Sequence, residues 1–205
     1  MPETSPLSML FATQLYQRPL GDAALIADLE ASCLQLAQDD AAGRRWCRAH
    51  DYRGYTSYAS LDDLPIRDPA FADLKRLLDR HVARFAEACA FDLGGRRLRL
   101  DSLWVNVLDG RGGHGGHIHP HSVVSGTVYV ALPPGSRGLK LEDPRLALMM
   151  AAPPRREDAP EHLQTFIDVQ PEPGTVLLWE SWLRHEVPPG SGTGKRISVS
   201  FNYRW

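Results

Sequence analysis

The chain has 205 residues, with 23 lysine and arginine residues against 25 aspartate and glutamate residues, and hence a formal net charge of −2. This length fits one domain, and the near-neutral charge excludes a surface that attracts nucleic acid or anionic membranes by charge alone. Hydrophobic residues make up 43% of the chain, enough for a packed core and too many for a disordered chain.

The first half of the chain carries apolar residues at helical spacing. Residues 22–38 form one predicted helix, with Asp22 in position to cap its first turn. A second helix is predicted over about 69–90, where Asp68 is the N-cap and Pro69 takes the first helical position. The apolar face of this second helix carries Phe71, Leu74, Leu78, Phe85 and Cys89.

In the second half the apolar period changes to two, which is typical of strands. Leu98 and Leu100 alternate in one phase, whereas the apolar residues from Leu103 onward alternate in the other. This change of phase predicts a bulge near Asp101 and Ser102. Further strands are predicted at 123–132, 139–142, 165–169, 175–180 and 195–204, separated by turns rich in proline and glycine.

Short strands at close intervals favour a mainly β fold of the α+β class, a jelly roll or barrel whose helices cover one sheet. We expect one domain over residues 1–205, with a mostly helical N-terminal part at 1–95 and a β core at 96–205. Residues 144–163 lack any period and are predicted to form a long irregular loop or lid.

Two features bear on where the protein works. The N-terminal sequence MPETSPLSMLF lacks the basic segment and long apolar stretch of a secretory signal, and no apolar run has the length of a membrane span. The three cysteines, Cys33, Cys47 and Cys89, are odd in number and have no CxxC spacing, which argues against a disulfide framework and a thiolate zinc site. We therefore expect a cytoplasmic protein with reduced thiols.

Half of the eight histidines, His114, His117, His119 and His121, fall in the segment GGHGGHIHPHS. On an extended strand His117 and His119 point to the same face, close enough to share one metal ion. Neutral imidazole is the commonest ligand for zinc and iron. The pair alone is a weak signal, because histidine-rich tracts also occur as solvated loops, and a third ligand would have to come from elsewhere.

The C-terminal part offers such a ligand and a basic residue beside it. His185 follows the apolar strand TVLLWE, and Arg196 opens the strand KRISVSFNYRW. This strand alternates, with apolar residues on one face and Arg196, Ser198, Ser200 and Asn202 on the other. A polar face of this kind commonly faces water. If the helices cover the apolar face, however, Arg196 and Ser198 point into the barrel and form a clamp for a carboxylate.

The order of these motifs resembles the iron(II)/2-oxoglutarate-dependent oxygenase superfamily. His-x-His is followed by SGxxY, a glycine-bounded strand, a distal histidine and Arg-x-Ser. Within the superfamily, HIHPHSVVSGTVYV, PGTVLLWESWLRHEVPPG and KRISVSFN are similar to a bacterial and phage group of oxygenases with a His-x-His-Pro motif. The resemblance covers about residues 98–203, and LFATQLY and GYTSYASL agree with the same group more weakly.

The resemblance implies a double-stranded β-helix with iron(II) bound at one open end and 2-oxoglutarate as co-substrate. His117 matches the first metal ligand and His185 the distal one. Arg196 matches the basic residue that binds the far carboxylate of 2-oxoglutarate, and Ser198 is expected to assist it. Tyr129 is expected either to donate its hydroxyl to the same carboxylate or to pack in the core.

The sequence departs from the wider superfamily at His119, where an aspartate or glutamate usually stands, although the narrower group shares this histidine. Three neutral imidazoles leave the metal its full double positive charge, which still attracts the 2-oxoglutarate dianion. In an alternative arrangement His119 and His121 are the ligand pair and His117 lies behind them. Pro120 disturbs the strand between that pair, so we prefer His117, His119 and His185 as the catalytic metal ligands. His114 and His121 are then expected at the surface or on the substrate side.

We expect an iron(II)-dependent dioxygenase that oxidatively decarboxylates 2-oxoglutarate and hydroxylates a small-molecule or protein substrate that the sequence does not identify. Alternatives are a three-histidine metal enzyme without 2-oxoglutarate, either a cupin-like dioxygenase or a zinc hydrolase, and a non-catalytic jelly-roll binding module. The Arg196-x-Ser198 element favours the first interpretation, since neither enzyme alternative needs a carboxylate clamp. Residues 50–62 and 144–163 are expected to contact the substrate. Neither a nucleic acid nor a membrane is an expected partner, and the sequence does not indicate an oligomeric state.

Overall fold

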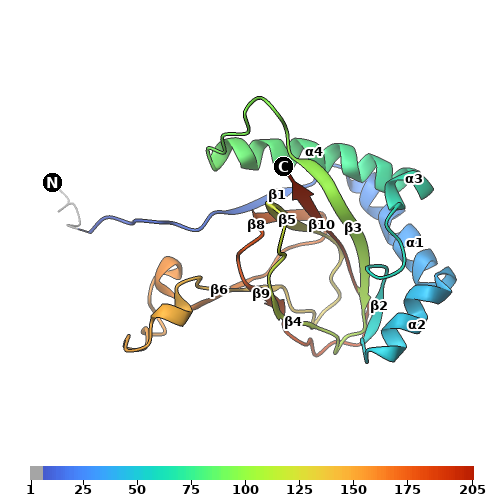
Figure 1. Cartoon of the computed structure of the whole chain (residues 1–205). Helices are drawn as coiled ribbons and strands as arrows, with labels where there is room; N and C mark the ends of the chain where they lie inside the picture. Colours follow the sequence, from blue (N-terminus) through green and yellow to red (C-terminus); the bar gives the residue numbers. More distant parts are fainter. Residues whose placement is uncertain (1–6) are drawn as a thin grey trace.

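The computed structural model describes residues 7–205 as two packed β-sheets with helices on the outside of one of them (Figure 1). The helices are α1 (Ala23–Asp39), α2 (Ala41–Ala49), α3 (Leu64–Arg67) and α4 (Pro69–Ala88). The strands are β1 (Leu15–Pro19), β2 (Gly54–Thr56), β3 (Arg99–Leu108), β4 (His114–His117), β5 (Val124–Ala131), β6 (Leu139–Glu142), β7 (Phe166–Val169), β8 (Thr175–Glu180), β9 (His185–Val187) and β10 (Arg196–Arg204).

The two predicted helices are confirmed as α1 and α4, and each begins where its capping residue stands. The Asp22 carboxylate accepts a hydrogen bond from the backbone N–H of Leu25 at 2.9 Å. The Asp68 carboxylate accepts one from Ala70 at 2.8 Å, directly before Pro69 in the first helical position. These caps satisfy backbone donors that have no partner within the helix, and so they fix both starting points.

All strand pairs are antiparallel. The larger sheet has the order β1-β8-β5-β10-β3-β2, and the smaller one has the order β4-β9-β6-β7. In the β3–β10 pair Asn202 lies opposite Ser102 and Tyr203 lies opposite Leu100, so Asp101 is an extra residue without a counterpart. The predicted bulge is thereby confirmed, and the strands predicted from residue 123 onward are confirmed as β5, β6, β7, β8 and β10.

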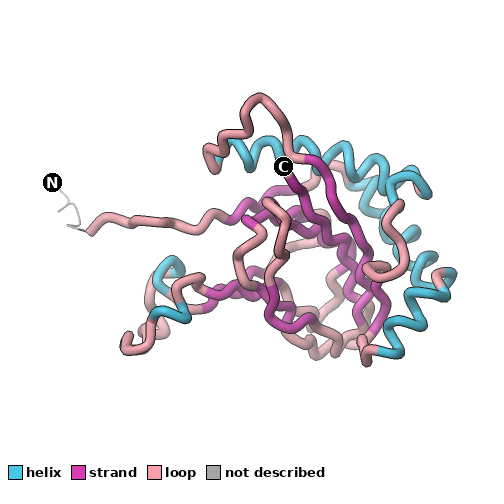
Figure 2. The backbone as a smooth tube through the Cα atoms, viewed as in Figure 1, coloured by secondary structure: helices cyan, strands magenta, loops and turns pink. Residues whose placement is uncertain are grey.

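The two faces of β10 have different surroundings. Its apolar residues belong to a core shared with α1 and α4, which lie along the outer face of the larger sheet (Figure 2). This core includes Ile197, Val199, Phe201 and Tyr203, each at most 1% exposed. The polar residues of β10 face the space between the two sheets. The expectation that Arg196 and Ser198 point into the barrel therefore holds.

The described residues before position 96 contain two short strands in addition to the four helices. β1 pairs with β8 and β2 pairs with β3, so these two strands form the edges of the larger sheet. Strands of five and three residues are too short to show a period of two, and their partners lie far away in the sequence. Within residues 7–205, no helix is long and apolar enough to cross a lipid bilayer.

Candidate functional site

A cavity of about 530 Å³ lies between the two sheets. Its wall is formed by the inward side chains of β3, β5 and β10 on one side and by residues of β4 and β9 on the other. It contains every residue that the sequence singled out for metal or co-substrate binding: His117, His119, His185, Arg196, Ser198 and Tyr129.

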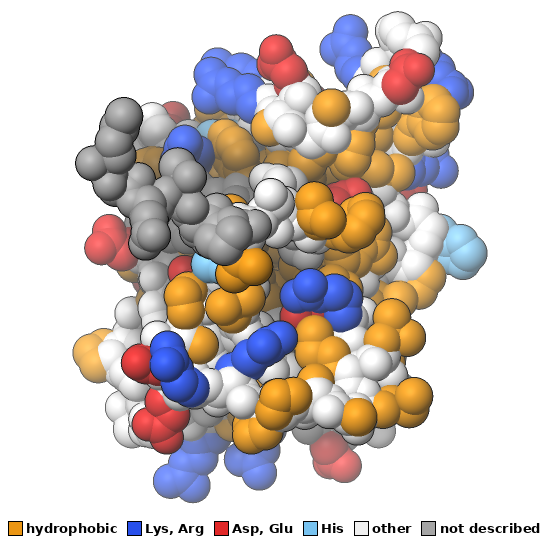
Figure 3. All heavy atoms as spheres, turned by 90° about the vertical axis from the view of Figure 1, so that its left-hand side faces the viewer, with side chains coloured by type: hydrophobic (Ala, Val, Ile, Leu, Met, Phe, Trp, Pro, Cys, Tyr) orange, Lys and Arg blue, Asp and Glu red, His pale blue; other side chains and the backbone are white. Residues whose placement is uncertain are grey.

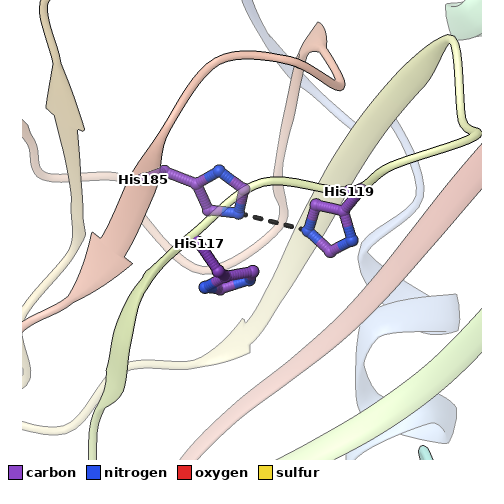
Figure 4. Close-up of side chains that lie close together, drawn as sticks. All are labelled: His117, His119 and His185. Carbon is purple, nitrogen blue, oxygen red and sulfur yellow. Dashed lines mark hydrogen bonds between the residues drawn. The ribbon is translucent and has the colours of Figure 1, made fainter. Parts of the chain in front are cut away.

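Three histidines converge at one point of this cavity (Figure 4). His117 ends β4 and lies opposite His185 at the start of β9, while His119 follows two residues later, directly before the turn at 120–121. One ring nitrogen of each lies within 4.8 Å of the others. The His119 backbone N–H donates to the Ser181 carbonyl oxygen at 3.0 Å, which ties the end of this segment to the loop that precedes His185.

The hydrogen bonds around the rings determine which nitrogens are available to a ligand. The Nδ1 of His117 lies 2.7 Å from the Gly115 carbonyl oxygen, and the Nδ1 of His185 lies 2.8 Å from that of Leu183. Because a carbonyl oxygen only accepts, both Nδ1 atoms carry the proton and both Nε2 atoms present a lone pair. Such carbonyl partners are typical of histidines that bind metals.

The spacing of these lone pairs fits a metal ion. His119 Nε2 lies 3.2 Å from His185 Nε2. With metal–nitrogen bonds of about 2.1 Å, two neighbouring ligand nitrogens lie roughly 3.0 Å apart at a right angle and roughly 3.4 Å apart at the tetrahedral angle. The residues present therefore fit a small transition-metal ion held by three imidazoles.

The charge state of the rings also suits this role. Burial, followed by the nearby His117, lowers the pKa of His119 to about 4. Burial lowers the pKa of His185 to about 3, with the Leu183 carbonyl opposing the shift and His117 adding to it. Both rings are therefore neutral at pH 7, and neutral imidazole is the form that binds a metal.

His121 does not join the cluster. Its side chain is exposed, its backbone has a φ of 71°, and it does not line the cavity, although its neighbours Pro120 and Ser122 do. Among the described residues, the arrangement brings together His117 and His119 rather than His119 and His121. The predicted effect of Pro120 on the strand accounts for this difference.

Arg196 is buried in the same cavity without a carboxylate partner among residues 7–205. Its side chain is 5% exposed. Its Nε donates to the Arg137 carbonyl oxygen at 3.0 Å and its Nη1 to Ser198 Oγ at 3.3 Å, while the guanidinium lies 5.2 Å from the centre of the Tyr129 ring. Burial lowers the pKa of Arg196, yet arginine stays charged in proteins. A buried, unpaired cation is costly, and an anionic ligand would relieve that cost.

Two buried polar atoms of cavity-lining residues have no hydrogen-bond partner within the described chain. They are the Tyr129 hydroxyl and the Trp179 Nε1. Tyr129 is fully buried, which raises its pKa to about 12 although Arg196 opposes the shift, so the hydroxyl keeps its proton. Both atoms are donors, and both belong to residues that line the cavity. Their lack of partners again indicates a bound acceptor.

The structure adds a hydrogen-bonded wall that the sequence did not reveal. Tyr52 Oη lies 2.6 Å from His114 Nε2 and 3.3 Å from Asn106 Oδ1. The Asn106 amide nitrogen donates to Ser200 Oγ at 3.1 Å, so its oxygen faces Tyr52 and accepts from the hydroxyl. The Tyr52 oxygen then accepts from His114 Nε2–H. Burial, followed by the charges of Arg196 and His117, lowers the pKa of His114 to about 4.

His114 is therefore a neutral cavity residue beside Arg196. It is neither at the surface nor at the end of the cavity that carries Asp101, but near the buried guanidinium, where its hydrogen bond to Tyr52 holds it. No signal in the sequence pairs it with Tyr52, because 62 residues separate them. The alternation along β3 predicts that the Asn106 side chain points inward. The orientation of its amide, however, depends on Ser200 of β10, a strand that is remote in sequence.

The two segments expected to contact the substrate differ in their placement. From 50–62, the side chains of Tyr52, Thr56 and Tyr58 line the cavity, whereas no residue of 144–163 does. The latter segment joins β6 to β7 at the outer edge of the smaller sheet, and it extends away from the two sheets (Figure 1). On that side of the molecule, exposed apolar side chains are interspersed with charged ones (Figure 3). Met150, for example, is 94% exposed.

Comparison with known proteins bears on the same site. Residues 102–202 match the family model described as "Putative 2OG-Fe(II) oxygenase", a span from β3 to β10 that includes the whole histidine cluster and Arg196. No curated protein matches the chain.

Solved structures share the fold at low sequence identity. A prolyl-4-hydroxylase from Pseudomonas putida aligns with a TM-score of 0.60 and 16% identity, covering 94% of this chain and 92% of that one. AviO1 from Streptomyces viridochromogenes gives 0.63 and 15%, covering 94% and 90%. HygX from Streptomyces hygroscopicus, solved with nickel and 2-oxoglutarate, gives 0.59 and 19%, covering 94% and 82%.

These likenesses establish the double-stranded β-helix that the family resemblance implied. The family match extends over the strands that carry the histidines and the buried arginine. The chain belongs to the superfamily of iron(II)- and 2-oxoglutarate-dependent oxygenases.

Proposed function

We propose that this oxygenase binds iron(II) through His117, His119 and His185 and binds 2-oxoglutarate through Arg196, Ser198 and Tyr129. The observation that carries the proposal is the buried, unpaired guanidinium of Arg196, placed in the same cavity as the three convergent imidazoles. A metal site alone would not require such a cation. A metal site with an anionic co-substrate would.

When bound, iron(II) and 2-oxoglutarate supply the oxidation of a substrate C–H bond by dioxygen, with 2-oxoglutarate converted to succinate and carbon dioxide. The protein contributes binding, orientation and exclusion of water. Three imidazoles leave the remaining metal positions to non-protein ligands. Their neutrality also leaves the full positive charge of the metal to attract the dianionic co-substrate.

The residues at the Arg196 end would orient that co-substrate. The guanidinium is held by Arg137 and Ser198, so it loses little further freedom when it pairs with a carboxylate. The Tyr129 hydroxyl, fixed in its protonated form, would donate to the same group. Around the triad, the Trp179 ring packs at 4.8 Å from the His185 ring and the Trp104 ring at 5.8 Å from the His119 ring. These rings exclude water from the metal position.

The second candidate is a three-histidine metal enzyme that does not use 2-oxoglutarate. The observation behind it is His119, which stands where a carboxylate is usual in the wider superfamily. Neither a hydrolase nor a cupin-like dioxygenase gives Arg196 a partner. The first proposal therefore explains more of the cavity.

The state of the cysteines supports a cytoplasmic location. Cys33, Cys47 and Cys89 are all free thiols, and the first two are buried. Secreted proteins commonly pair their cysteines, whereas reducing compartments keep them as thiols. We therefore propose that the protein works in the cytoplasm.

The decisive test of the co-substrate site is the affinity for 2-oxoglutarate of the Arg196→Ala variant. Calorimetry with manganese(II) in place of iron(II) should show a loss of about 10- to 100-fold, because a charge-assisted hydrogen bond contributes about 1.5–3 kcal/mol. Arg137→Ala is the matched control, since its exposed side chain is lost while its carbonyl oxygen still holds the residue at position 196. Unchanged affinity in Arg196→Ala would overturn the assignment.

A further inference from the structure

Among the described residues that line the cavity, only two have side chains with a formal charge at neutral pH, Arg196 and Asp101. They lie at opposite ends of it. Arg196 pairs with Leu108 at one end of the β3–β10 ladder, whereas Asp101 occupies the bulge beyond the Ser102–Asn202 pair at the other. Six residues of an extended strand separate these ends, which corresponds to about 20 Å.

The histidine triad lies between the two charges. Trp104, whose ring packs against His119, sits opposite Ser200 in the middle of the ladder. The cavity therefore has a cationic end on one side of the metal position and an end with a carboxylate on the other. The dianionic co-substrate is attracted to the first end and repelled from the second, so the Asp101 end is left for the substrate.

An aromatic surface leads from solvent to the triad at the Asp101 end. Tyr58 is 63% exposed and its ring meets the Trp104 ring edge-to-face at 5.2 Å. Ile118, which is 43% exposed, lines the same cavity and follows His117 directly in the chain. Exposed aromatic and apolar side chains at the mouth of a cavity are characteristic of a ligand-binding surface, and aromatic faces attract cations.

The polar groups at this end are fixed and uncharged. Ser125 Oγ donates to Asn202 Oδ1 at 2.8 Å, and Asn202 Nδ2 donates to Ser102 Oγ at 3.1 Å. Asp101 itself pairs with Arg204 at 3.3 Å, but both side chains are solvent-exposed and Arg204 does not line the cavity. An exposed pair of this kind is weak, so an incoming cation can replace Arg204 at little cost.

We propose that the Asp101 end binds the oxygenase substrate and selects a ring-bearing amine, with the ring against Trp104 and Tyr58 and the ammonium group beside Asp101. The inference rests on the proposed function, because it places the ring next to His119, which that proposal assigns to the metal site. Carboxylates and phosphates are disfavoured at this end by Asp101, and the cationic end is already taken by the co-substrate.

The test uses three probes that share a hydroxyphenyl ring and differ in charge: tyramine is cationic, tyrosol is neutral and hydroxyphenylacetate is anionic. Their dissociation constants are measured by ligand-observed NMR on the full chain. One series contains manganese(II) and N-oxalylglycine to fill the Arg196 end, and a second contains neither. We expect tyramine to bind about fivefold more tightly than tyrosol, and the acid to bind least in the filled protein.

The Asp101→Asn variant should bind tyramine and tyrosol equally. Asp109→Asn is the matched control, because Asp109 is an exposed acid near the other end of β3 that does not line the cavity, and it should retain the preference. Equal binding of the three probes to the parent protein, or a preference that survives in Asp101→Asn, would overturn the inference. Failure of N-oxalylglycine to bind would instead count against the proposed function, and the series without it would still test Asp101.

Discussion

At the scale of single residues, two backbone carbonyl groups determine how the histidines behave. The Gly115 and Leu183 oxygens hold Nδ1–H of His117 and His185, so both Nε2 lone pairs are directed to one point. Burial keeps the His119 and His185 rings neutral, which prepares them for a cation but makes them costly to protonate. A site arranged in this way is stable as a neutral cluster or as a metal complex, and unstable in acid.

The pH dependence of stability follows from these pKa values. The pKa values of His114, His119 and His185 lie at about 4, 4 and 3 in the folded protein, against about 6.5 unfolded. Between these values the unfolded chain binds more protons, so the free energy of unfolding falls as the pH falls. Each histidine contributes a loss of up to about 1.4 kcal/mol per pH unit.

Urea denaturation of the chelator-treated protein between about pH 7 and pH 5 measures this loss. His119→Gln should weaken the pH dependence, because one of the three groups no longer titrates. His50→Gln is the control, since that histidine is exposed and does not itself line the cavity, and the variant should retain the pH dependence of the parent protein. Stability that rises on acidification through this range would contradict the explanation.

At the scale of elements, β5 and β10 must approach closely to close the cavity floor. Gly126 on β5 lies opposite Phe201, and a Cβ atom there would come within 2.5 Å of the Phe201 ring and 2.6 Å of the Leu177 carbonyl oxygen. The glycine allows the aromatic core residue of β10 to fill the space beside the sheet. Glycine is therefore required at position 126 by packing rather than by the turn geometry that glycines often serve.

Gly126→Ala should lower the free energy of unfolding by about 1–3 kcal/mol, because the added methyl group forces the ring or the neighbouring strand to shift. Gly115→Ala is the matched control within β4, where a Cβ atom would meet nothing within 4 Å. Denaturant titration of both variants compares the two effects. Equal stability of the two variants would show that the close approach at Gly126 does not constrain the sheet.

The elements also explain how far the sequence predicts the molecule. Long segments with a clear period, such as the helix that begins after Asp68 and the alternating strand from Arg196, are recognisable alone. The same alternation correctly assigns Arg196 and Ser198 to the cavity. By contrast, β1, β2 and the Tyr52–His114 pair depend on partners remote in sequence, and no local pattern encodes such contacts.

At the scale of the whole molecule, the near-zero net charge conceals a strongly polarised cavity. Arg196 is buried at one end, Asp101 lies at the other, and the neutral histidine triad stands between them. The surface needs no excess of either sign, because the attraction of a small dianion is local to the metal position and the guanidinium. The helices on the outer face support this arrangement by packing on the apolar side of the strand that carries Arg196.

The central claim is that one metal ion is bound by His117, His119 and His185 with the co-substrate extending to Arg196. Crystals grown with manganese(II) and N-oxalylglycine test it directly through anomalous diffraction at the metal. We predict a single strong peak within bonding distance of the three imidazole nitrogens, and N-oxalylglycine density running from it to the Arg196 guanidinium. A peak bound by His121 or His114 instead, or an empty position between the three rings, would contradict the account.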